Sequence, residues 1–289
     1  MNRYLVLGSK IAICIFALIG FVFSGVFIAM HFGLLNVRGS ILERNAFFMG
    51  STTAQTAASI QADNTPSCSD GTNVCDWSKT REWAVVEGGL QKDSSVIADV
   101  SSKTGVSSRL IASVVVPEQI RFFTSNREVF KRYFEPLKLL GSLSQFSLGV
   151  SGIKQETANQ IEKYANDPTS PFYPGDGYAI LLAYQPGVDH DTELYNRLTD
   201  PKNHYYSYLY TALFIKEIEA QWARAGYPIS SKPEIVATLF NIGFENSVPK
   251  ADPQVAGASI TVGGRTYAFG QLAGSFYSSS ALAGVLGSK

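Results

Sequence analysis

The sequence predicts a mainly α protein in which a transmembrane helix precedes a helical domain with one small β-hairpin. Residues 11–30 form an uncharged apolar run of twenty residues, long enough for a helix to cross the hydrocarbon core of a bilayer. Most of the later segments repeat their apolar residues at the helical period. Residues 259–269 instead alternate around Gly263-Gly264, the pattern of two short strands joined by a tight turn.

The apolar run is expected to remain in the mature protein as an anchor. A cleaved signal peptide has a shorter apolar region and small residues at its cleavage site, whereas Met30-His31-Phe32 follows here. Residues 1–10 carry Arg3 and Lys10, which favours a cytoplasmic N-terminus. The rest of the chain is therefore expected on the other side of the membrane.

Residues 31–75 are expected to form a juxtamembrane helix followed by a linker rich in Ser, Thr, Ala and Gln. Within the linker, Cys68 and Cys75 flank the polar loop SDGTNV at a spacing compatible with a local disulfide. Such a pair indicates an oxidising compartment, and the alternative is two free thiols in a cytoplasmic loop. Neither a His nor a further Cys is close enough in sequence to complete a zinc site.

Composition and motifs exclude several functional classes. Lys plus Arg and Asp plus Glu number 24 each, so no basic field for nucleic acid is present. The three histidines, His31, His190 and His204, are isolated in the sequence, and the chain has no P-loop, dinucleotide fingerprint or nucleophile elbow. We therefore predict no metal, no cofactor and no nucleic-acid partner.

Residues 76–289 are expected to fold as one domain. Its predicted helices span residues 77–90 with a break at Gly88-Gly89, 94–103 ending before Gly105, 107–118, 126–140, 154–165, 178–183, 191–198, 203–223, 233–240 and 271–286.

The predicted helix that ends at Glu118 is the most apolar of these. Ser107 or Ser108 can cap its first turn, and the apolar residues that follow recur at the spacing of a buried stripe. Desolvation and the negative end of the helix dipole would both favour a protonated Glu118. A carboxyl group that keeps its proton near neutral pH is what a general acid requires.

Four short motifs follow one another along residues 94–250. The first is the apolar helix from Val106 to Glu118. The second contains Ser147, Gly149, Ile153, Thr157 and Ala158. The third contains Asp200, Pro201, Asn203 and Tyr210, with Ser207 where a glycine is usual, and the fourth contains Ala237, Asn241 and Gly243, with Phe240 where a tyrosine is usual. In types, spacing and order the four motifs resemble those of the lysozyme-like lytic transglycosylase superfamily of cell-wall enzymes.

This resemblance implies a lysozyme-like helical domain that cleaves peptidoglycan without a metal or cofactor. Glu118 falls at the position of the family's single catalytic acid/base, which acts on the β-1,4 bond between N-acetylmuramic acid and N-acetylglucosamine. The implied substrate-binding residues are Ser147, Gly149, Ser151, Asn203, Tyr210, Phe240 and Asn241. The implied location is a bacterial inner membrane, crossed once at residues 11–30, with the domain in the periplasm among glycan strands and within reach of an envelope protein complex.

Three departures from the family pattern leave alternatives open. Gly152 stands in place of a glutamine that contacts the glycan, Phe240 lacks a hydroxyl group, and the segment 119–143 is longer than usual. A catalytically weakened glycan-binding or scaffold domain is therefore one alternative. A hydrolytic muramidase is another, although it usually needs a second carboxylate, and none of the acidic residues that could provide one lies in a motif: Asp176, Asp189, Asp191, Glu128 and Glu135.

Overall fold

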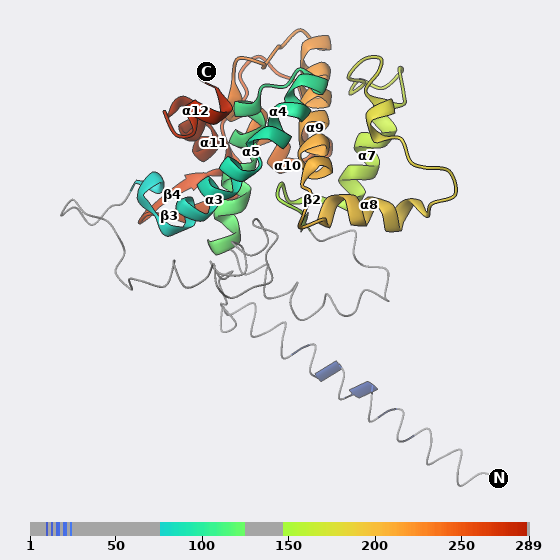
Figure 1. Cartoon of the computed structure of the whole chain (residues 1–289), viewed down its shortest axis with the longest axis horizontal. Helices are drawn as coiled ribbons and strands as arrows, with labels where there is room; N and C mark the ends of the chain where they lie inside the picture. Colours follow the sequence, from blue (N-terminus) through green and yellow to red (C-terminus); the bar gives the residue numbers. More distant parts are fainter. Residues whose placement is uncertain are drawn as a thin grey trace.

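Figure 1 shows a computed structural model of the chain, which describes residues 76–124 and 147–287. Seven residues nearer the N-terminus are also described, all helical: Lys10, Ile13, Phe16, Ala17, Gly20, Phe21 and Ser24. Most of the predicted anchor, the segment 31–75 with Cys68 and Cys75, and the predicted helix 126–140 lie outside the described residues. Among the residues that are described, no helix combines the length and the apolar character needed to cross a membrane.

The prediction of a mainly α protein is confirmed. The helical elements of the first half are η1 (Trp77–Lys79), α3 (Arg81–Lys92), α4 (Ser94–Thr104), α5 (Ser108–Thr124) and α7 (Gln155–Ala165). Those of the second half are η4 (Ala179–Leu182), α8 (His190–Thr199), α9 (Tyr205–Arg224), α10 (Pro233–Ile242), η5 (Phe244–Asn246), α11 (Phe269–Ser278) and α12 (Ala283–Leu286).

Two antiparallel strand pairs accompany these helices. Strands β3 (Ser259–Val262) and β4 (Arg265–Ala268) form the predicted hairpin, with Ile260 opposite Tyr267 and the turn at Gly263-Gly264. Strands β1 (Ser147–Leu148) and β2 (Ile153–Lys154) form a second pair that the sequence did not predict. Strands of two residues are too short to show an alternating pattern.

Two predictions about the continuity of helices are wrong. Helix α3 continues through Gly88-Gly89 because Val86, Gly89 and Leu90 are buried on its inner face, and this packing outweighs the low helix propensity of glycine. The predicted helix 271–286 is two helices, α11 and α12, separated by a turn in which Leu282 has a φ of 56°. The predicted end of α4 is confirmed, since Gly105 caps it with a φ of 72°.

Helices α5 and α9 lie at the centre of the described fold. Helix α9 packs against α4, α7, α8 and α10, and α5 packs against α3, α4 and α11. In Figure 1, α7 and α8 lie on one side of α9, and α11 and α12 lie on the other side, beyond α5. Both central helices are buried over most of their length, which fits their high apolar content.

Arg109, near the start of α5, is a buried arginine that hydrogen-bonds to the C-terminal part of the chain. Its side chain is 1% exposed. Its guanidinium group donates hydrogen bonds to the backbone carbonyls of Phe276, Tyr277, Ser279, Ala281 and Gly287. A cation at the end of α11 satisfies carbonyl groups that have no partner within that helix.

Candidate functional site

Glu118 lies within α5 and not at its end. The helix continues to Thr124 although Pro117 is inside it. The continuation buries Ile120 and Phe123 in the core, and this gain offsets the backbone hydrogen bond that Pro117 cannot make. The predicted end of the helix is therefore wrong. Glu118 does not lie at the C-terminal end of α5, so the negative end of the helix dipole does not favour its protonation.

The carboxyl group of Glu118 forms an ion pair with Arg121, one turn further along α5. Nη2 of Arg121 lies 2.7 Å from Oε1 and 2.6 Å from Oε2 of Glu118. The side chains are 12% and 15% exposed, so the pair is largely shielded from solvent. Both carboxyl oxygens are thus occupied by a cation that stays charged at any physiological pH.

Gly152, in the turn between β1 and β2, lies against Glu118. It has a φ of 65°, and a β-carbon at this position would lie 2.7 Å from Cγ of Glu118 and collide with its carboxyl group. A glutamine at this position would not fit beside Glu118 in this conformation. The first and second motifs are thus in direct contact, at the residue where the second departs from the family.

The second motif is also joined to the third. The backbone N–H of Val150 donates to the hydroxyl group of Ser207 (3.1 Å), and the hydroxyl group of Ser151 donates to the Ser207 carbonyl (3.0 Å). A β-carbon at Gly149 would lie 2.6 Å from Oγ of Ser207. On the other side, Gln119 donates from its side-chain amide to the Val150 carbonyl. The β1–β2 turn is therefore held by hydrogen bonds to both α5 and α9.

The other predicted site residues have structural partners. Asn203 is exposed, and its side chain accepts from the backbone N–H of Tyr205 at the start of α9. Asn241 accepts from the backbone N–H of Ala258 at 2.8 Å, and the ring of Phe240 packs 4.8 Å from that of Phe214. Tyr210 is buried and donates to Glu162. Within the described part of the chain, no hydrogen bond joins any of these four residues to Glu118. For Ser147 the structure gives only the backbone, paired with Lys154.

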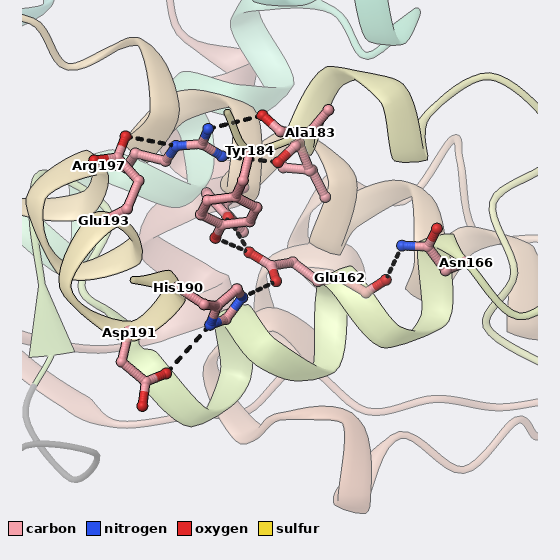
Figure 2. Close-up of polar contacts among 10 residues, drawn as sticks. Glu162, Asn166, Ala183, Tyr184, His190, Asp191, Glu193 and Arg197 are labelled. Carbon is pink, nitrogen blue, oxygen red and sulfur yellow. Dashed lines mark hydrogen bonds and ion pairs between the residues drawn. The ribbon is translucent and has the colours of Figure 1, made fainter. Parts of the chain in front are cut away.

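A second largely shielded carboxyl group, that of Glu162 in α7, was not identified from the sequence. Figure 2 shows it at the centre of a polar cluster from four segments. Its Oε1 accepts hydrogen bonds from the hydroxyl groups of Tyr184 (2.5 Å) and Tyr210, and its Oε2 lies 2.7 Å from Nε2 of His190. Burial is the main cause that raises the pKa of both tyrosines. They therefore act as neutral donors.

The edge of this cluster is charged. The hydrogen bond to Glu162 raises the pKa of His190, although partial burial opposes the effect. Arg197 donates to the carbonyls of Leu182 and Ala183, and its guanidinium carbon lies 3.9 Å from the centre of the Tyr184 ring (Figure 2). Among the described residues, no three His, Cys, Asp or Glu side chains are placed to hold a metal ion.

Comparison with known proteins adds no assignment: no protein-family model matches the chain, and no curated protein or solved structure matches it either.

Proposed function

We propose that the chain is a membrane-anchored lytic transglycosylase that cleaves the glycan strands of peptidoglycan, with Glu118 as its single general acid/base. The observation that carries this proposal is the contact between Glu118 and the β1–β2 turn at Gly152. The sequence resemblance requires these two motifs to meet, although residues 119–151 separate them. The hydrogen bonds between this turn and Ser207 support the same arrangement for the third motif.

In the proposed reaction, Glu118 first donates a proton to the glycosidic oxygen between N-acetylmuramic acid and N-acetylglucosamine. The bond between this oxygen and the anomeric carbon of N-acetylmuramic acid breaks, and N-acetylglucosamine leaves with the donated proton on its hydroxyl group. As a carboxylate, Glu118 then takes the proton of the muramic 6-hydroxyl group, whose oxygen bonds to the anomeric carbon and gives a 1,6-anhydro product. Arg121 must turn away before the first step, because it occupies both carboxyl oxygens in the structure. Glycan binding beside Glu118 would have to displace it.

The proposed location follows from the N-terminal sequence. Residues 11–30 would anchor the chain in a bacterial inner membrane and leave residues 76–289 in the periplasm, where a Cys68–Cys75 disulfide could form. Glycan strands are the proposed substrate there, and an envelope protein complex is a proposed partner.

A catalytically weakened, glycan-binding domain is the second candidate, and the Glu118–Arg121 ion pair favours it. In this geometry both carboxyl oxygens of Glu118 contact the guanidinium group of Arg121 and not a free space for a glycosidic oxygen. The glycine at position 152 and the missing hydroxyl group of Phe240 remove two further polar contacts that the family uses.

Assay of the full-length chain on purified peptidoglycan separates the candidates. We expect the wild type to clear the cell wall and Glu118→Gln to lose at least about 100-fold of this activity, the usual scale of general acid catalysis. Glu156→Gln, which changes an exposed glutamate on α7, is the matched control and should keep full activity. Mass spectrometry of the products should show 1,6-anhydro ends, whereas reducing ends would indicate a hydrolytic muramidase.

Two outcomes contradict the proposal. Equal clearing by wild type and Glu118→Gln removes Glu118 from the mechanism. Binding to peptidoglycan without cleavage by the wild type selects the glycan-binding candidate.

A further inference from the structure

Helix α8 is fastened to α7 by its first residue, His190. Nε2 of the imidazole lies 2.7 Å from Oε2 of Glu162, and Nδ1 lies 3.2 Å from Oδ1 of Asp191 (Figure 2). The side chain of His190 is 45% exposed and that of Glu162 is 14% exposed, so the bridge lies at the edge of the buried cluster.

Both ring nitrogens of His190 therefore face carboxylate oxygens. A carboxylate only accepts hydrogen bonds, and a neutral imidazole has a single N–H. The neutral ring can donate to Glu162 or to Asp191, and its other nitrogen then presents a lone pair to the remaining carboxylate. Only the imidazolium donates to both, so the two hydrogen bonds exist together only when both ring nitrogens of His190 are protonated.

The surrounding charges favour the protonated ring. The start of a helix is unfavourable for a cation, but the acidic residues around it outnumber the cations. The titratable and charged groups around the imidazole, directly or through Glu162, are Glu162 on α7, Asp189, Asp191, Glu193 and Arg197 on or beside α8, Tyr184 before it, and Tyr210 on α9. The raised pKa of His190 agrees with this arrangement.

The other end of α8 reaches the site of Glu118. A β-carbon at Gly149 would collide with the carbonyl of Leu198, so the backbone of the β1–β2 turn lies directly on the last residues of α8. The same turn places Gly152 against Glu118. A movement of α8 away from α7 would therefore remove the contact between Leu198 and the β1–β2 turn, which also contacts Glu118.

We propose that His190 is a proton-controlled latch that fastens α8 to α7 and, through α8, holds the Ser147–Lys154 hairpin against Glu118. The latch is a property of the fold, and only its effect on catalysis rests on the proposed function. His190 is thus a positioning residue for the hairpin. A periplasmic enzyme built in this way would respond to the pH outside the cytoplasm.

Hydrogen exchange of the full-length chain at about pH 6 and about pH 8, on either side of the usual histidine range, tests the latch. After correction for the intrinsic pH dependence of exchange, residues 190–199 and 147–154 of the wild type should exchange about fivefold more slowly at the lower pH. This is the effect of a partly exposed ion pair worth about 1 kcal/mol.

His190→Gln should remove the difference, and His190→Lys, which keeps a charge, should protect both segments at both pH values. Asn196→Gln, on the exposed side of α8, is the matched control and should behave as the wild type.

Each outcome bears on a different part of the proposal. Wild-type exchange that does not change with pH, or a change that persists in His190→Gln, overturns the latch. A response in residues 190–199 without one in residues 147–154 overturns the connection to Glu118. Absence of cell-wall cleavage would contradict the proposed function and leave the exchange result standing.

Discussion

Glu118 in α5 and Glu162 in α7 are carboxyl groups with similar exposure, 12% and 14%, but different partners. Glu118 pairs with Arg121, one turn away on its own helix. Glu162 accepts from Tyr184, His190 and Tyr210, which come from three other segments. The first arrangement lies within one helix and its donor is an arginine, whereas the second joins several segments and its donors include a histidine.

The two glutamates therefore differ in how many elements of the fold their contacts connect. The Glu118–Arg121 ion pair connects two residues of the same helix, so it joins no other element through this contact. The Glu162 cluster connects α7 to α8, to α9 and to the segment that carries Tyr184. We therefore expect Glu118 to tolerate substitution far better than Glu162, and the site proposed for chemistry to be the less important of the two for stability.

Removal of the Glu162 carboxyl group should have the largest effect. Glu162→Ala leaves two tyrosine hydroxyl groups and His190 without their acceptor, and we expect it to lower the free energy of unfolding by about 3 kcal/mol. Glu118→Gln should cost less than about 1 kcal/mol. Chemical denaturation of the two variants measures the difference, and equal losses would contradict the contrast drawn between the sites.

The close contact at Gly152 should have the next largest effect. Gly152 and Gly105 both have positive φ values, 65° and 72°, but only Gly152 has a neighbour within reach of an added β-carbon. Gly105→Ala should cost about 1 kcal/mol for the backbone conformation alone. Gly152→Ala should cost about 2 kcal/mol, because Glu118 must also move. If the two variants are equally stable, Glu118 does not pack on the turn.

Much of the fold could be predicted from the sequence, because long apolar periodicity and end signals such as Gly105 act locally. The continuation of α5 past Glu118 could not, since Pro117 and the charged residues after it resemble a helix end. Only the burial of Ile120 and Phe123 in the tertiary structure extends the helix.

The two sites likewise differ in how far their contacts depend on residues close in the sequence. The motif around Glu118 is a run of adjacent residues, and the spacing of Glu118 and Arg121 fits a helical ion pair. The donors to Glu162 lie 22, 28 and 48 residues away in sequence, so no local pattern connects them. The contact between Gly152 and Glu118 likewise depends on how the β1–β2 turn folds back onto α5.

Glu217 in α9 is a third carboxyl group, and among the described residues it has no hydrogen-bond partner. It is fully buried, and neither carboxyl oxygen has a hydrogen-bond partner in the described structure. Burial raises its pKa well above 4.5. Because the folded state binds this proton more tightly than the unfolded state, stability should fall as the pH rises from about 4.5 through the folded-state pKa.

Glu217→Gln should remove this part of the pH dependence. At about pH 8 we expect the variant to be more stable than the wild type by at least about 1 kcal/mol, with little difference near pH 4. Thermal unfolding across this pH range measures it. An Asp252→Asn control, at an exposed position, should follow the wild type. A variant that is less stable than the wild type at every pH would mean that Glu217 has a partner.

The Glu118–Arg121 pair itself should give the smallest effect. A double-mutant cycle with Glu118→Gln and Arg121→Gln isolates the interaction from other losses, and we expect about 1 kcal/mol because the pair is largely buried. The matched cycle uses Asp99→Asn and Lys103→Gln in α4, a pair at 2.8 Å whose side chains are 47% and 41% exposed, and should give a smaller coupling energy because solvent screens these charges. Equal coupling energies would show that burial adds nothing to the Glu118 pair. A coupling of several kcal/mol would mean that Arg121 cannot leave Glu118, in which case the glycan-binding candidate becomes the stronger one.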